Sequence, residues 1–166
     1  MGDVRMRTPT VTDAAAMWNL LIAAGLDRNS PYAYLLVCTD FAATSLVAED
    51  EDGLVGAVAA YRPPPRPQAV FVWQVGVAER ARGQGLARRM LHELLQMPGN
   101  ADATELTATV TPDNEPSLRL FRGLARELGV GCEESPRFLA EHFPVGAGDH
   151  QPENELVVGP VDRSTA

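Results

Sequence analysis

Hydrophobic and polar positions follow a two-residue period in some segments and a 3.6-residue period in others, which predicts alternating strands and helices. In the first half, the predicted elements are a strand at 4–8, helices at 13–23 and 30–41, and a hairpin of strands at 45–48 and 54–61 around Asp52-Gly53. Ser30-Pro31 has the chemistry of a helix start, and Asp52-Gly53 is a strong hairpin signal.

A nearly unbroken apolar run at 70–77 predicts a central strand buried on both faces. Four prolines within 63–67 precede this run and predict an extended loop. The later predicted elements are amphipathic helices at 86–97 and about 114–128, a half-buried strand at 106–111, and one last strand at 155–158 in a loop-rich C-terminal third. We expect one α/β domain over residues 1–166, frayed after about residue 162.

Charge and composition exclude several classes of function. The chain has 166 residues and a net charge of −8, which argues against a nucleic-acid partner. No apolar stretch reaches the roughly 18 residues of a membrane helix, and the N-terminus lacks a signal core, so we expect a cytoplasmic protein. All basic residues are arginine, which excludes lysine Schiff-base chemistry and a GxxxxGK[ST] loop. Cys38 and Cys132 are too few for a zinc or disulfide framework, and we expect each to be a buried thiol.

The strongest chemical motif lies between the strand at 70–77 and the helix at 86–97. It reads Arg80-Ala-Arg82-Gly83-Gln84-Gly85. Glycines let successive backbone N–H groups and a helix N-terminus close around a phosphate, and the nearby arginines (Arg80, Arg82, Arg88 and Arg89) add positive charge. The motif therefore predicts a pyrophosphate site.

The motif has two other interpretations. The glycines alone could serve only a tight turn between strand and helix. A dinucleotide loop of the Rossmann type fits poorly, because Arg88 stands where a third Gly or Ala is needed and the loop follows the fourth predicted strand.

In this setting Arg-x-x-Gly-x-Gly resembles the acetyl-CoA loop of the GNAT superfamily of N-acetyltransferases, and the order of predicted elements resembles the GNAT fold. A finer resemblance, to the L-2,4-diaminobutyric acid acetyltransferases of ectoine biosynthesis, rests on three stretches: GLDRNSPYAYLLVCTDF, YRPPPRPQAVFVWQVGV and ATVTPDNEPSLRLFRGLAR. The resemblance covers roughly residues 5–158. It implies a mixed, mostly antiparallel central sheet flanked by helices.

The resemblance further implies an acetyl-CoA-dependent enzyme, with no metal, that acetylates the γ-amine of L-2,4-diaminobutyrate and forms a homodimer. Carried onto this sequence, the implied cofactor-binding residues are Val75, Val77, Arg80, Arg82, Gly83, Gln84, Gly85, Leu86, Ala87, Asn114 and Ser117. The implied substrate-binding residues are Asp27, Tyr32, Trp73, His150 and Glu153. Without the resemblance, the two aromatics would pass as core or rim residues, and His150 and Glu153 as solvated surface.

The implied mechanism is direct acetyl transfer. Asp27 and Glu153 are the candidate base and ammonium anchor, in either order, and the Val75 amide would stabilise the oxyanion. Phe121 stands where many GNAT relatives have a tyrosine, so another group protonates the thiolate or it leaves unassisted. A metal site at His142, His150 and Glu153 lacks any recognised zinc spacing. The alternatives are a GNAT enzyme for another amine or a peptide N-terminus, a CoA-binding sensor without catalytic activity, and a dinucleotide-dependent enzyme.

Overall fold

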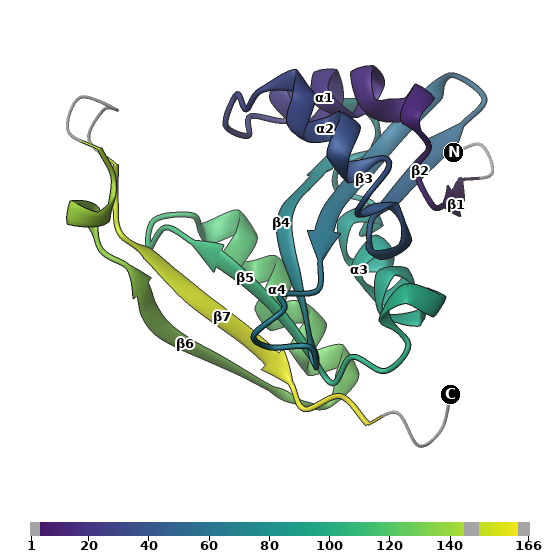
Figure 1. Ribbon diagram of the computed structural model, residues 1–166. Coiled ribbons are helices and arrows are strands. Elements are labelled where there is room, and N and C mark those ends of the chain that lie inside the picture. The colour runs from purple at the N-terminus through teal and green to yellow at the C-terminus, as the bar shows by residue number, and fades with distance from the viewer. Residues whose placement is uncertain (1–3, 145–149, 163–166) are drawn as a thin grey trace.

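The computed structural model describes residues 4–144 and 150–162, which form one seven-stranded sheet with helices on both faces (Figure 1). The strands are β1 (Arg5–Arg7), β2 (Leu46–Asp50), β3 (Gly53–Tyr61), β4 (Ala69–Val77), β5 (Glu105–Val110), β6 (Gly131–Phe138) and β7 (Glu153–Gly159). Their spatial order is β1-β2-β3-β4-β5-β7-β6. Among these neighbours β4 and β5 pair in parallel and the others pair antiparallel. The predicted mixed, mostly antiparallel sheet is confirmed.

Two pairs of helices cover the two faces of the sheet. The α-helices are α1 (Ala14–Ala23), α2 (Pro31–Val37), α3 (Leu86–Gln96) and α4 (Glu115–Leu128), and short 3-10 turns lie at Val11–Asp13, Ala42–Thr44, Glu79–Ala81, Pro98–Asn100 and Ala140–His142. Helices α1 and α2 form one hydrophobic core with the sheet, and α3 and α4 form the other. No helix in the described part of the chain is long and apolar enough to span a bilayer.

Strand β6 corrects the prediction of a loop-rich C-terminal third. It pairs with β7 along its length and lies at the edge of the sheet. Its sequence, GCEESPRF, lacks the alternation that identifies a strand, because nearly all of its residues are exposed. A strand at the edge of a sheet tolerates charged side chains and a proline, whereas a central strand does not.

Two further segments differ from the prediction. Helix α2 ends at Val37, and the chain turns over 38–41, where a longer helix was expected. The proline-rich segment 63–67 is not extended: the Arg66 N–H donates a 2.9 Å hydrogen bond to the Pro63 carbonyl and closes a turn. Proline is favoured at the second position of such turns, so a proline-rich segment need not be extended.

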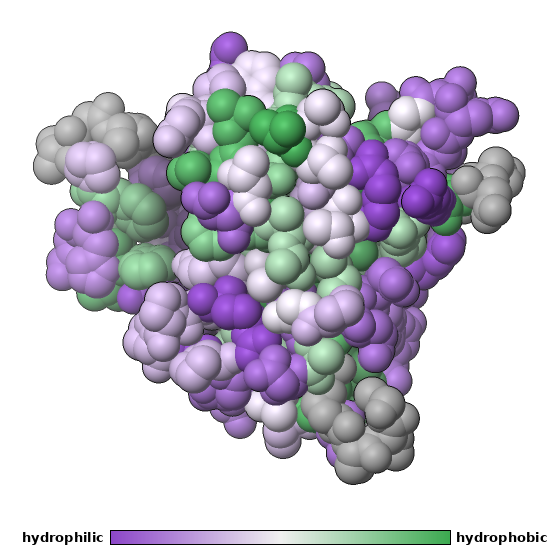
Figure 2. Space-filling view, turned by 45° about the vertical axis from the view of Figure 1, so that its right-hand side comes forward, coloured by the Kyte–Doolittle hydropathy of each residue, from purple (hydrophilic) through white to green (hydrophobic). Residues whose placement is uncertain are grey.

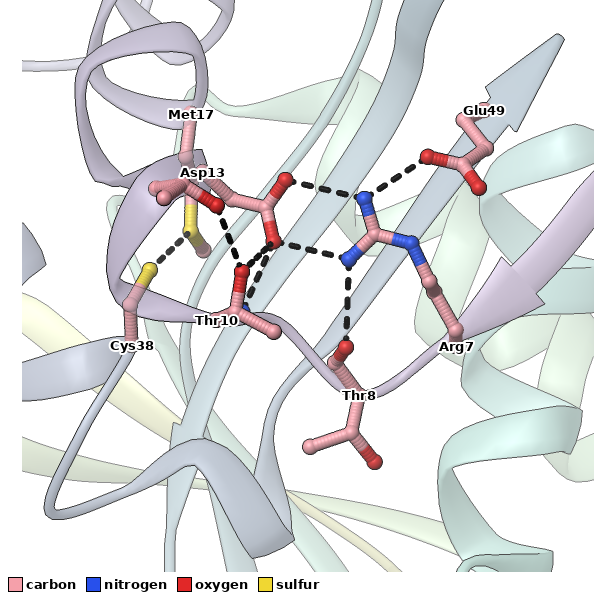
Figure 3. Close-up of polar contacts among 8 residues, drawn as sticks. Arg7, Thr8, Thr10, Asp13, Met17, Cys38 and Glu49 are labelled. Carbon is pink, nitrogen blue, oxygen red and sulfur yellow. Dashed lines mark hydrogen bonds and ion pairs between the residues drawn. The ribbon is translucent and has the colours of Figure 1, made fainter.

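A partly buried ion-pair cluster joins β1 to the start of α1 and to β2 (Figure 3). Arg7 donates to both oxygens of Asp13, at 2.7 and 2.9 Å, and to Glu49 at 2.7 Å. Thr10 donates to Asp13 through its N–H and its hydroxyl. Hydrogen bonds from Arg7, against the opposing cost of burial, lower the pKa of Asp13 to about 2. The cluster thereby fixes where α1 begins.

The two cysteines have different surroundings. Cys38 is buried beside the Met17 sulfur, 3.9 Å away, and burial raises the pKa of its thiol to about 11. Cys132, on the edge strand β6, is only half-buried, so the predicted buried thiol holds for Cys38 and not for Cys132. Both thiols are free.

Candidate active site

Strands β4 and β5 pair over a short distance and then separate. Their register runs from Ala69 opposite Glu105 to Val72 opposite Ala108 and stops there. Both strands continue beyond this point, so they diverge toward the end of the sheet nearer α1 (Figure 1). A hollow of about 510 Å³ occupies the gap and is lined by β4, β5 and α4. This hollow is called the cofactor cleft below.

The separation coincides with a bulge in β4. On the side facing β3, Ala59 pairs with Gln74 and Ala60 pairs with Val72, which leaves Trp73 as an extra residue. A bulge redirects the side chain it carries. Trp73 is 38% exposed and lines the cofactor cleft, whereas most of β4 is buried.

Beyond the bulge, the backbone of β4 presents amides to the gap. The N–H of Ala78 donates to the Val55 carbonyl on β3, at 2.8 Å. Successive residues of a strand direct their N–H and C=O groups to opposite edges, so Val77 and Val75 direct theirs toward the edge that β5 has left. Consistent with this direction, Nε of Arg82 donates to the Val77 carbonyl at 3.3 Å. These amides can bind an extended ligand as a missing strand would.

The loop after β4 forms the tight turn that its glycines predict. Gly83 and Gly85 have φ angles of +74° and +72°, and Gly85 caps the N-terminus of α3. This conformation is costly for residues with a Cβ, so glycine suits both positions. Arg82 lines the cofactor cleft, and it has no ion-pair partner within 4–144 and 150–162. Arg82 is therefore the arginine best placed to meet a phosphate.

The other arginines near the loop have carboxylate partners or face elsewhere. Arg80 binds Asp50 through both terminal nitrogens, and Arg88 donates from Nε to Glu127 at 2.9 Å. Arg89 lies in a separate depression beside β1. Two of the four arginines expected to add positive charge around the loop, Arg80 and Arg88, are therefore paired with carboxylates of neighbouring elements.

The remaining predicted cofactor residues lie around the same cleft. Ala87 lines it, while Leu86 is turned into the core and can offer only its amide. Gln84 is exposed on the loop, and its amide donates to the Arg80 carbonyl at 3.4 Å. Asn114 and Ser117 line the opposite wall at the start of α4, where Asn114 Oδ1 accepts the Ser117 N–H at 3.1 Å.

A second hollow, of about 540 Å³, adjoins the cofactor cleft and contains the charged side chains. The charged residues lining it are Asp27, Arg137 and Glu153. It shares part of its lining with the cofactor cleft, including Trp73 and Gln74. Three predicted substrate residues, Asp27, Trp73 and Glu153, therefore lie around one space, which is called the acidic cleft below.

The loop that carries Asp27 is held in place by its neighbours. Trp18 Nε1 donates to the Asn29 carbonyl at 2.9 Å, and the Asn29 N–H donates to the Asp27 carbonyl at 3.1 Å. Arg28 lies over the Trp18 ring, 5.3 Å from its centroid. These contacts fix the backbone of Asp27 while its side chain stays exposed at the cleft.

Two predicted substrate residues lie outside the acidic cleft. Tyr32 is 64% exposed on the outer side of α2 and does not line the cleft. His150 stacks on Phe143, with ring centroids 3.9 Å apart, and it is Phe143 that lines the cleft. Gln151 donates to Asp113 at 2.8 Å, which ties the segment after His150 to the loop before α4.

A buried pair of residues beneath Trp73 was not predicted. The Tyr34 hydroxyl donates to Gln74 Oε1 at 2.5 Å, and the Tyr34 ring stacks on Trp73 with centroids 5.9 Å apart. Helix periodicity could have identified it, because Tyr34 and Val37 share the inner face of α2, whereas Tyr32 lies about 200° away from Tyr34 around the helix.

Among the described residues, no group of three His, Cys, Asp or Glu side chains is arranged to hold a metal ion. The conceivable site at His142, His150 and Glu153 is not formed, since His142 Nδ1 accepts the Leu139 N–H and His150 stacks on Phe143.

Comparison with known proteins accounts for this arrangement. A model of the acetyltransferase (GNAT) family matches residues 14–125, which span both the Asp27 loop and the glycine loop. The chain belongs to the GNAT family. A more distant structure, that of the ribosomal-protein-S18-alanine N-acetyltransferase from Escherichia coli, shares the fold at 15% identity with a TM-score of 0.70, covering 96% of this chain and 95% of that one.

Two closer relatives are named for the same substrate. An L-2,4-diaminobutyric acid acetyltransferase from Halalkalibacterium halodurans is 44% identical over 92% of this chain and 80% of its own length. The structure of the diaminobutyrate acetyltransferase EctA from Paenibacillus lautus, in complex with L-2,4-diaminobutyric acid and coenzyme A, has a TM-score of 0.92 and 36% identity over all of both chains. The resemblance found in the sequence is confirmed.

Proposed function

We propose that this GNAT protein transfers the acetyl group of acetyl-CoA to the γ-amine of L-2,4-diaminobutyrate, as in ectoine biosynthesis. The observation that carries the proposal is the junction of the two clefts at Trp73 and Gln74. A thioester extended along β4 from the glycine loop reaches this junction, where an amine held by Asp27 or Glu153 would meet it. The relatives named for the same substrate support this choice.

The cofactor half of the site follows from the backbone. The N–H groups of Val75 and Val77 would pair with the pantetheine arm, while the turn at Gly83 and Gly85 and the side chain of Arg82 would hold the pyrophosphate. Asn114 and Ser117 would contact the arm from the α4 side. In the transition state the Val75 amide would donate to the oxyanion, and one such donor is typically worth about 3 kcal/mol.

The acidic cleft would prepare the amine. An alkylammonium of pKa near 10 must lose a proton, which costs about 4 kcal/mol at neutral pH. Asp27 and Glu153 supply two carboxylates, one to accept the proton directly or through water and one to hold the α-ammonium away from the thioester. Trp73 would form part of the cavity wall at the junction where thioester and amine meet. Phe121 lines the cofactor cleft, and its side chain cannot donate a proton to the departing CoA thiolate.

The proposal includes a cytoplasmic homodimer of one domain per chain. Large apolar side chains are exposed on and just after α2, namely Tyr32, Leu35 and Phe41. Beside them lies an almost wholly apolar hollow of about 200 Å³. Figure 2 shows apolar side chains gathered in the upper part of the visible face, at the height of α1 and α2. A second copy would cover such a surface, and Leu35→Arg should then give a monomer in sedimentation, whereas a wild-type monomer would contradict the dimer.

The test of function is CoA release from acetyl-CoA with diaminobutyrate, ornithine, lysine or a peptide N-terminus as acceptor. We expect diaminobutyrate to be strongly preferred. Equal rates with all four acceptors would defeat the specific claim in favour of a less selective GNAT enzyme. Binding of acetyl-CoA without release by any amine would favour the sensor.

A further inference from the structure

Arg137 is the cation of the acidic cleft. It is the one basic side chain among the described residues that line this cleft. It lies on the edge strand β6, where Pro136 pairs with Asn154 and Phe138 pairs with Glu153, so Arg137 is an extra, bulged residue. Arg137 and Trp73 are thus both placed at the cleft by bulges, which commonly redirect side chains beside active sites.

The guanidinium of Arg137 is held by its surroundings but keeps free donors. Its carbon lies 5.2 Å from the centroid of the Phe71 ring and 5.1 Å from that of Phe138. Nη1 donates to Glu155 Oε1 at 2.8 Å. A guanidinium has five N–H donors, and within the described residues this is the hydrogen bond that Arg137 makes. The remaining donors can bind a planar anion, a carboxylate above all.

Arg137 shares its carboxylate partner Glu155 with a second arginine. Glu155 Oε1 also accepts from Arg66, at 3.1 Å, so one carboxylate is shared between two guanidinium groups. Arg66 has a second partner in Glu105, at 2.8 Å, whereas Arg137 has none among the described residues. Arg137 therefore has one carboxylate partner among the described residues, which it shares, and most of its donors remain available at the cleft.

The charges that line the acidic cleft match those of an α,ω-diamino acid. Asp27 and Glu153 are two carboxylates for two amino groups, and Arg137 is one guanidinium for one carboxylate. We propose that Arg137 binds the carboxylate of the diamino acid and thereby selects an amino acid over a simple diamine. This inference rests on the proposed function and assigns the partner of the substrate carboxylate.

The test compares two acceptors that differ only in the carboxylate, L-2,4-diaminobutyrate and 1,3-diaminopropane. In Arg137→Gln, kcat/KM for diaminobutyrate should fall roughly 10- to 100-fold, mostly through KM, as expected when a hydrogen bond to a charged group is lost. For 1,3-diaminopropane, kcat/KM should change by less than about threefold, because that molecule has no carboxylate to bind Arg137. If 1,3-diaminopropane is not acetylated, its inhibition constant against diaminobutyrate gives the same comparison.

Two further variants separate binding from structure. Arg137→Lys keeps the charge but not the planar fork, so it should recover part of the loss for diaminobutyrate. Arg66→Gln removes the other arginine on Glu155 without lining the cleft, and it should leave the ratio between the acceptors unchanged. Equal losses of both acceptors in Arg137→Gln, or no loss of either, would overturn the assignment of Arg137. Wild-type protein inactive with diaminobutyrate would instead overturn the proposed function itself.

Discussion

The hydroxyl of Tyr34 donates to Oε1 of Gln74 across 2.5 Å, which links the inner face of α2 to β4 directly beside the bulge. Burial raises the pKa of the Tyr34 hydroxyl, so the group stays protonated and acts as the donor. Gln74 lines both clefts. The hydrogen bond therefore fixes a polar side chain at the place where the two substrates would meet.

Removing this hydroxyl should destabilise the fold. Tyr34→Phe leaves a nearly buried acceptor on Gln74 without its donor, which we expect to cost about 1–3 kcal/mol of unfolding free energy. Urea denaturation measures the loss. Tyr61→Phe is the matched control, because the Tyr61 hydroxyl has no hydrogen-bond partner among the described residues. Equal stabilities of the Tyr34 and Tyr61 variants would show that the bond contributes nothing.

The glycine loop can be tested at Gly85. Gly85→Glu would place a carboxylate at the N-terminus of α3, where it should repel a pyrophosphate and weaken acetyl-CoA binding at least about 100-fold in calorimetry. Gly129→Glu controls for backbone strain, since Gly129 also has a positive φ, +68°, and lies at the far end of α4. No atom lies within 4 Å of a Cβ at either position, so steric clash affects neither variant. Similar affinities in both variants would contradict a phosphate site at the loop.

Substitution of Asp27 should affect the reaction of the amine without affecting the binding of the cofactor. Asp27→Asn should lower kcat/KM for diaminobutyrate by about 100-fold or more, because a positioned general base or anchor contributes on this scale. The dissociation constant of acetyl-CoA should not change. Asp40→Asn, also exposed but outside the acidic cleft, should leave both quantities as they are. An active Asp27→Asn variant with unchanged KM would place the substrate elsewhere.

The Arg7–Asp13 pair predicts a dependence of stability on pH. The pKa of Asp13 falls from 3.8 to about 2 on folding, which corresponds to roughly 2 kcal/mol. Because the folded pKa is depressed, this contribution is present above pH 4 and is lost as the pH falls through 2. Asp13→Asn should therefore be less stable than wild type at pH 6, with the difference shrinking toward pH 2. A difference that stays constant between pH 6 and pH 2.5 would contradict this account.

The sequence predicted the local structure around the glycine loop, because the signals for it lie close together along the chain. An apolar strand, glycines that require positive φ, and an amphipathic helix follow one another along the chain, so Gly83, Gly85 and the cleft wall at Ala87 could be placed without tertiary contacts. The arginines were harder to place. Arg80 and Arg88 have partners that are 30 or more residues away in sequence, and no local pattern reveals such pairs.

The part of the site that would bind the amine depends on contacts between residues far apart in the sequence, which no local pattern reveals. Strand β6 was missed because an edge strand needs no apolar alternation, and Arg137 was missed with it. Tyr34 was not named, although the phase of α2 turns it inward and leaves Tyr32 exposed. The bulge at Trp73 was also not predicted, since it is defined by the register with β3.

The most direct measurement is the structure of the reaction product. After incubation of the purified protein with acetyl-CoA and L-2,4-diaminobutyrate, proton–carbon NMR identifies the nitrogen that carries the acetyl group. We predict acetylation of the γ-nitrogen, with one CoA released for each product formed. Acetylation of the α-nitrogen, or the absence of any acetylated diaminobutyrate, would contradict the proposed function.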